Sequence, residues 1–154
     1  MEAGNRYIVL NTIKSMPGIR YMELKRLTGL SYGTLTYHLA MLEREGSIRV
    51  MRTSRKSRYY PSGVDDLEAD VIDCIRSRTC KDVLAVILEH GIATLDMLSK
   101  LLNKAKTTVK YHVDRLKYKG IVEGKRIGRY IFYRVKSDTI LSKIRASLLV
   151  STSR

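Results

Sequence analysis

The sequence predicts a mainly α-helical protein with small β-hairpins (an α+β fold), built from two copies of one small unit. The first observation is an internal repeat: residues 7–61 match residues 81–135 at a constant offset of 74, with thirteen identities and no gap. The second is that each copy holds three segments of helical apolar spacing, followed by two short alternating segments. Two copies of a unit, rather than a long array, indicate two tandem domains.

In the first copy we expect helices over residues 5–15, 22–28 and 32–45 and strands near 48–50 and 58–60. Val9 and Ile13 have helical spacing, and Leu24 and Leu27 are expected to point inward from the second helix. Ser31 is a candidate N-cap for the third helix, and Gly46 stands where a left-handed residue is needed after it.

The third helix of the first copy has a single core-facing stripe formed by Leu35, Leu39 and Leu42. A basic loop over residues 53–57 joins the two strands that follow. The stripe leaves the other faces of this helix for polar contacts.

The second copy repeats this order, with expected helices over 82–90, 95–102 and 105–119 and strands near 121–124 and 129–135. Thr94 opens its second helix, and Gly120 closes its third. We therefore divide the chain into domain 1 (1–61), an acidic linker helix (62–78), domain 2 (79–136) and a C-terminal amphipathic helix (137–154).

The two segments outside the repeat are expected to organise the assembly. The linker has apolar residues at helical spacing, and the C-terminal helix begins after Ser137 with the stripe Ile140, Leu141, Ile144, Leu148 and Leu149. Such a stripe must be buried, either on its own chain or against a second chain. A homodimer through the C-terminal or the linker helix therefore remains open.

The charge balance indicates a polyanionic partner. The 29 Lys and Arg residues exceed the 15 Asp and Glu residues, which gives a formal net charge of +14. Nucleic acid and an anionic membrane surface would both attract such a chain. Because no run reaches about 18 apolar residues, we expect no membrane span. With no signal peptide and with two cysteines, too few for a disulfide framework, we expect a cytoplasmic protein.

Three helices followed by a two-stranded hairpin form the winged helix-turn-helix arrangement. The stretch Leu24 to Leu39, followed by Leu42-Glu43-Arg44-Glu45-Gly46, resembles the helix-turn-helix of ArsR/MarR-type regulators. The second copy is less similar, because Asn103-Lys104-Ala105-Lys106 replaces the Gly-Leu-Ser turn. The tandem arrangement also resembles that of regulators found in archaea. The resemblance implies DNA binding, and proteins of this kind are often dimers.

The outward face of each third helix and the hairpin loop after it supply the expected DNA contacts. A helix in the major groove presents its N-terminal outward residues to base edges, and arginines of the wing suit the backbone or the minor groove. In domain 1 we expect contacts from Ser31, Tyr32, Thr34, Thr36, Tyr37, Arg44, Arg52, Arg55, Lys56 and Arg58. In domain 2 the expected residues are Lys104, Lys106, Thr107, Thr108, Lys110, Tyr111, Lys125, Arg126 and Arg129.

No pattern in the sequence indicates a metal, a cofactor or catalysis. His38 and His112 are each isolated in their copy, and the spacing of Cys74 and Cys80 fits no zinc motif. We expect these histidines to be packed or to touch phosphate. Asp114 is unusual on a phosphate-facing helix and could pair with Lys110 or accept a hydrogen bond from cytosine.

The sequence thus predicts a non-enzymatic, sequence-specific regulator of transcription that binds double-stranded DNA through helices 32–45 and 105–119. The alternative is a winged-helix adaptor that joins proteins in a transcription complex or another nucleic-acid complex. An adaptor should show an apolar patch on the outward face of the third helix, whereas this face carries Thr, Tyr, Lys and Arg.

Overall fold

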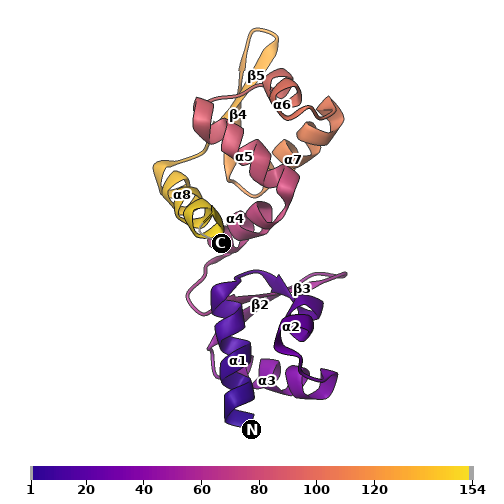
Figure 1. Ribbon diagram of the computed structural model, residues 1–154. Coiled ribbons are helices and arrows are strands. Elements are labelled where there is room, and N and C mark those ends of the chain that lie inside the picture. Colours follow the sequence, from indigo (N-terminus) through magenta and orange to yellow (C-terminus); the bar gives the residue numbers. More distant parts are fainter. Residues whose placement is uncertain (1, 153–154) are drawn as a thin grey trace. The chain divides into compact units, whose positions relative to one another are not determined.

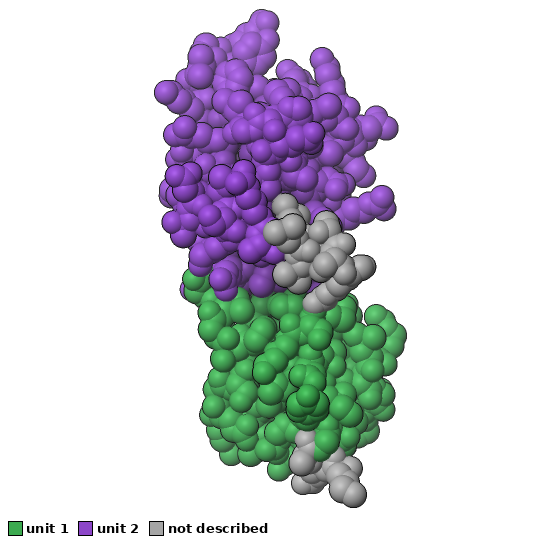
Figure 2. Space-filling model, turned by 60° about the vertical axis from the view of Figure 1, so that its left-hand side comes forward, with its two compact units in different colours: residues 1–65 green, residues 66–154 purple. Residues whose placement is uncertain are grey.

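Helices dominate the computed structural model, which describes the backbone of residues 2–152 and the side chains of residues 4–147 (Figure 1). The chain divides into two compact units, residues 1–65 and residues 66–154, which are coloured green and purple in Figure 2. Both small sheets are antiparallel. The described residues contain no helix that is both long and apolar enough to cross a membrane.

The described residues of unit 1 form three helices and a three-stranded sheet. The elements are α1 (Glu2–Ser15), β1 (Ile19–Arg20), α2 (Tyr21–Thr28), α3 (Tyr32–Arg44), β2 (Ile48–Arg52) and β3 (Ser57–Pro61). The strand order is β1-β3-β2, so the second hairpin strand is central. Strand β1 was not predicted from the sequence, because a two-residue strand is too short to show alternation.

The core of unit 1 forms where the apolar stripes of its helices meet the sheet. Val9 and Ile13 of α1, Leu35 of α3 and Ile19 of β1 are completely buried in one cluster. Gly46 follows α3 with a φ of 76°, which confirms the left-handed residue expected there. This arrangement leaves the opposite face of α3 for solvent.

Unit 2 contains five helices and a two-stranded sheet within the part of the chain that is described. Its elements are α4 (Asp66–Arg76), α5 (Arg78–His90), α6 (Leu95–Leu102), α7 (Lys106–Tyr118), β4 (Val122–Ile127), β5 (Tyr130–Val135) and α8 (Asp138–Thr152). An isolated bridge between Ala93 and Tyr133 stands where unit 1 has its short first strand.

The second and third helices of the two units have boundaries that coincide at the offset of 74 found in the sequence. Helices α2 and α6 begin and end at matching residues, as do α3 and α7. The hairpins share one register: Arg52 pairs with Ser57 in unit 1, and Arg126 pairs with Ile131 in unit 2. Matching sequence positions therefore occupy matching positions in each unit.

Helices α4 and α8 pack within unit 2. Val71 and Ile75 of α4 and Ile140 and Ile144 of α8 belong to the core cluster of that unit. Of the two open alternatives for the C-terminal stripe, these residues take the one on their own chain. The stripe positions Leu148 and Leu149 lie outside the residues whose side chains are described.

A disulfide between Cys74 and Cys80 joins the end of α4 to the start of α5. The sequence did not predict this pair, because two cysteines are too few for a disulfide framework and their spacing fits no zinc motif. The pair closes a short loop, since the two residues are six positions apart.

The expectation that Leu27 points inward is wrong, because its side chain is 54% exposed. Leu24 is completely buried, and Leu27 lies three positions further, which turns it about 60° away from the stripe on a helix. Leu101, the matching residue of α6, is exposed as well.

Candidate nucleic-acid interface

The N-terminal turn of α3 is fixed by a hydroxyl cap. The Ser31 Oγ accepts a hydrogen bond from the Thr34 backbone N–H at 3.3 Å and donates to the Thr34 hydroxyl at 2.9 Å. This confirms Ser31 as the N-cap. Ser31 and Tyr32 are exposed, and Thr34 is half-buried. The cap thus orders the backbone at the end of α3 that we expect to approach base edges.

Tyr21 of α2 supports two of the expected contact residues, and the sequence interpretation missed it. Its hydroxyl lies 2.9 Å from the Thr36 hydroxyl and donates to the Tyr32 carbonyl oxygen at 3.2 Å. The rings of Tyr21 and Tyr32 stack with centroids 6.1 Å apart, and the Lys25 Nζ lies 4.4 Å from the Tyr32 centroid. Nothing in the apolar periodicity of α2 predicts these contacts, because they join polar atoms of two helices.

Tyr37 projects from the middle of α3 with 49% of its side chain exposed. Its ring meets the buried His38 ring edge-to-face at a centroid distance of 5.3 Å, and the Arg6 guanidinium lies 6.0 Å from the Tyr37 centroid. These contacts hold the Tyr37 ring while much of its surface stays accessible. Arg44, at the end of the helix, is exposed.

The wing of unit 1 is a tight basic loop between β2 and β3. The Thr53 hydroxyl accepts hydrogen bonds from the backbone N–H groups of Arg55 and Lys56 at 3.4 and 3.2 Å, and the Thr53 N–H donates to the Lys56 carbonyl at 2.8 Å. Arg55 is exposed and Lys56 is half-buried. The wing therefore presents positive charge on an ordered turn.

Arg52, at the end of β2, is exposed but already forms an ion pair. Its two terminal nitrogens donate to the two carboxylate oxygens of Glu43 at 2.9 and 2.6 Å. The hydrogen bonds from Arg52 lower the pKa of Glu43, and the same bonds raise the pKa of Arg52. Glu43 thus competes with any phosphate for this arginine.

Arg58 differs from the other expected contact residues because it is buried, with 9% of its surface exposed. Its strand is central in the sheet, and its guanidinium donates to the Gly18 carbonyl oxygen at 2.8 Å. The structure therefore corrects the prediction for Arg58: it stabilises the packing of β3, and we remove it from the contact set. Its counterpart in the repeat is Phe132, which is half-buried.

The matching face of α7 carries more charge. Lys104, Lys106, Thr107, Thr108, Lys110 and Tyr111 are all exposed. Lys106 pairs with Asp96 of α6. Lys110 donates to Asp114 at 2.6 Å, which selects the first of the two roles considered for Asp114.

The wing of unit 2 mixes basic and apolar residues. Lys125, Arg126 and Arg129 are exposed. Arg129 donates to the Tyr130 hydroxyl at 3.0 Å and lies 5.1 Å from the centre of that ring. Ile127 is also exposed, so this wing differs chemically from the hydroxyl-rich wing of unit 1.

The histidines are packed to different extents. His38 is completely buried, and its Nδ1 accepts a hydrogen bond of 3.5 Å from Arg6, so it is a packed residue. Burial, followed by the nearby Arg115 charge, lowers the pKa of His112. Among the described residues there is no group of three His, Cys, Asp or Glu side chains that could hold a metal ion.

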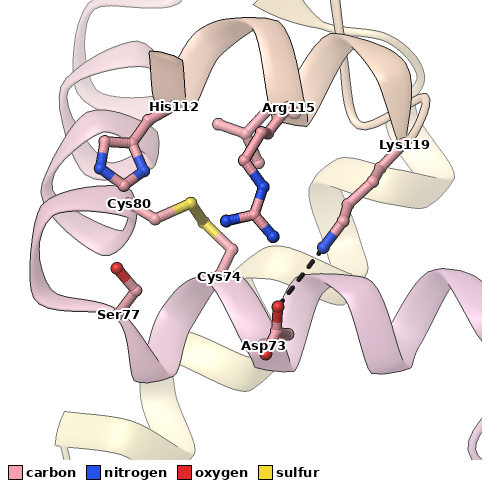
Figure 3. A pocket seen from close by; sticks show the side chains of 8 residues that line it. Asp73, Cys74, Ser77, Cys80, His112, Arg115 and Lys119 are labelled. Carbon is pink, nitrogen blue, oxygen red and sulfur yellow. Dashed lines mark hydrogen bonds and ion pairs between the residues drawn. A yellow bond between two sulfur atoms is a disulfide. The ribbon is translucent and has the colours of Figure 1, made fainter. Parts of the chain in front are cut away.

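A small pocket of unit 2 lies between the disulfide and α7 (Figure 3). His112 and Arg115 of α7 line this pocket beside the Cys74–Cys80 bridge, and Lys119, directly after α7, points toward Asp73. Lys119 reaches carboxylate oxygens of Asp70 and Asp73 at 3.6 and 3.4 Å. The end of α7 is thereby tied to α4.

Comparison with known proteins agrees with this geometry. Residues 3–72 match a family model described as an N-terminal HTH domain. Over 132 residues the chain is 28% identical to a protein of Methanocaldococcus jannaschii named as an uncharacterized HTH-type transcriptional regulator. The match covers 86% of this chain and 33% of the relative, so the chain spans about a third of that protein's length.

Solved structures from Mycobacterium bovis share the fold. One is the homodimeric winged helix-turn-helix DNA-binding domain of a possible ArsR-family regulator, with a TM-score of 0.51, 20% identity and coverage of 58% of this chain and 82% of that one. A second, a possible transcriptional regulatory protein, has a TM-score of 0.50, 21% identity and coverage of 56% and 92%. The winged helix-turn-helix fold predicted from the sequence is thus confirmed over somewhat more than half of the chain.

Proposed function

We propose that this helix-turn-helix chain, related in sequence to a transcriptional regulator, binds double-stranded DNA sequence-specifically and regulates transcription. The observation that carries the proposal is the exposed face of α3. A capped N-terminal turn presents hydroxyl and tyrosine side chains there, and an ordered basic wing stands beside them. In this reading α3 enters the major groove and the wing lies on the backbone or in the minor groove.

The finer part of the proposal is that the chain holds two winged helix-turn-helix domains, over residues 1–61 and 79–136, and that both bind DNA. Support comes from the matching boundaries of α3 and α7 and from the shared register of the two hairpins. The residues proposed for domain 2 are those of α7 and its wing named above. Two linked sites on one duplex would add avidity to modest single contacts.

Polar chemistry favours DNA over a protein adaptor. The described outward residues of α7 are mainly Lys, Arg, Thr and Tyr, and the net charge of +14 would attract a polyanion. An adaptor interface would instead have an apolar centre with few charges. The exposed Leu27 and Leu101 lie on the preceding helices and do not form such a centre on α3 or α7.

We further propose a homodimer in the cytoplasm, where chromosomal DNA would be accessible in an archaeal cell. One of the similar Mycobacterium bovis domains is homodimeric, which supports the dimer. Intracellular proteins are rich in disulfides in hyperthermophiles and poor in them elsewhere, so the Cys74–Cys80 bridge restricts this location to a cell of the first kind. Light scattering at several protein concentrations tests the dimer: a mass near 17.6 kDa at all of them would contradict it.

The test of DNA binding is a gel shift with duplexes selected from a random pool, at 50 and 200 mM salt. If about 6–10 phosphates are contacted, affinity should fall by roughly 10³–10⁵ between these concentrations. Absence of a shift at 50 mM salt, with competitor omitted, would refute the proposal.

Two variants separate positioning from reading. The double variant Arg55→Ala/Lys56→Ala should weaken binding to all duplexes about equally, because it removes phosphate contacts. Tyr37→Ala should change the selected sequence instead. Lys14→Ala/Lys136→Ala removes the same charge from exposed positions outside the proposed DNA surface and outside the helices considered for dimer formation, and it serves as the matched control. An exchange of the two effects would refute the assigned roles.

A further inference from the structure

The two units differ at one pair of matching positions beside the proposed DNA surface. Unit 1 has Glu43 on α3 and Arg52 at the end of β2, and the offset of 74 places Lys117 and Arg126 at these positions in unit 2. An acidic and a basic residue in unit 1 thus correspond to two basic residues in unit 2.

In unit 1, Glu43 and Arg52 bind each other. Both Arg52 nitrogens contact both Glu43 oxygens at 2.6 to 2.9 Å, which is a bidentate arrangement. A carboxylate and a phosphate offer similar paired oxygens to a guanidinium. Glu43 therefore occupies the place that a phosphate would take.

In unit 2 the same framework holds two cations. α7 matches α3 residue for residue, and β4 and β5 keep the register of the first hairpin, so Lys117 and Arg126 project from equivalent places. Both are exposed. The neighbouring acids are already engaged: Asp114 contacts Lys110, and Glu123 contacts Arg134 at 2.9 Å.

We propose that Lys117 and Arg126 together bind one phosphate of the DNA backbone, at the place where unit 1 holds its own carboxylate. Because Glu43 and Arg52 are in contact in unit 1, the matching positions would bring two like charges near each other in unit 2, and a phosphate between them would relieve their repulsion. Unit 2 then anchors the chain on the backbone, and unit 1 contributes more to base reading. This inference rests on the proposed function, since the phosphate belongs to the same duplex.

Two reciprocal substitutions test the inference. Lys117→Glu copies the unit 1 pair into unit 2, and Glu43→Lys copies the unit 2 pair into unit 1. The readout is the slope of log K against log salt, which changes by about 0.9 for each phosphate contact. We expect Lys117→Glu to make the slope shallower by about one and Glu43→Lys to make it steeper by about one.

Lys136→Glu is the control for the change in net charge, because it makes the same alteration at an exposed residue outside this surface. If Lys117→Glu changes the slope no more than Lys136→Glu does, the inference is wrong. Lys117→Ala and Arg126→Ala add a second criterion that does not depend on Lys117→Glu folding. Two side chains that share one phosphate should be non-additive, so full additivity in the double variant would also overturn the inference.

The outcome also distinguishes this inference from the proposed function. If the wild-type chain shifts no duplex at 50 mM salt, the proposed function fails, and this inference fails with it. If the wild-type chain binds and the reciprocal substitutions leave the slope unchanged, only the shared phosphate site is refuted.

Discussion

Reduction of the Cys74–Cys80 disulfide should destabilise unit 2 and leave unit 1 unchanged. The bridge joins α4 to α5, and both sulfur-bearing residues are buried in the unit 2 core. Because the cysteines are six positions apart, the closed loop has about seven residues, and loop-closure entropy predicts about 2 kcal/mol of stabilisation.

Native-state hydrogen exchange measures this loss unit by unit. A loss of about 2 kcal/mol corresponds to roughly 30-fold faster exchange of the most protected amides. The expected acceleration after reduction lies in α4, α5 and α7, since Lys119 ties the last of these helices to α4. Amides of α1 and α3 are the internal control.

Reduction of the wild-type chain leaves both side chains in place, so no cavity complicates the comparison. The variant Cys74→Ala/Cys80→Ala should reproduce the result and should no longer respond to the reductant. Unchanged exchange in unit 2, or equal acceleration in both units, would refute this account of the disulfide.

Three smaller perturbations test the local structure by urea unfolding. Ser31→Ala should lower the free energy of unfolding by about 1 kcal/mol, because it removes the N-cap of α3. Ala105→Ser should raise it, because α7 has no side-chain cap. A change of the same sign in both variants would contradict the capping argument. Gly120→Ala should cost about 1 to 2 kcal/mol because φ is 76° there, and an unchanged midpoint would show that the turn relaxes. Burial lowers the pKa of His112 in the folded protein below its ordinary value of 6.5. As the pH falls below 6.5, the unfolded chain therefore protonates this histidine before the folded chain does. Stability should therefore decrease through that range until the folded pKa is reached, and His112→Gln should weaken this dependence; a wild-type stability that rises on acidification would contradict the sign.

Local sequence signals predicted much of the fold because each depends on neighbouring residues. The hydroxyl caps Ser31 and Thr94 accept the expected backbone hydrogen bonds from Thr34 and Met97. The left-handed glycine after α3, and Gly120 after α7, follow from the need to end a helix without a Cβ clash. Such signals involve only residues that are close in sequence, so they do not depend on the packing of the rest of the chain.

The wrong or missing predictions concern residues whose burial or pairing depends on how separate elements pack together. In the sequence, Arg58 looks like a further basic residue beside the basic loop. Its burial is evident only from its position on a central strand, near the Gly18 carbonyl. Leu27 has a spacing compatible with a stripe on a short helix, but two turns are too few to fix the stripe's direction. The disulfide likewise depends on how α4 meets α5.

The candidate interface was predictable as a surface but not as a set of available charges. Periodicity identified the exposed faces of α3 and α7, since the buried stripe fixes them. The partners of individual side chains, such as Glu43 on Arg52, came only from the structure. The tests of these contact residues are the binding experiments given above.

The most direct test of the central claim is a map of backbone amide chemical shifts during titration with a selected DNA duplex. We predict that the largest changes fall in the N-terminal halves of α3 and α7 and in the two hairpin loops. Changes confined to α1, α5 or α8, or no change at 50 mM salt, would contradict the claim that the chain recognises DNA with α3 and α7.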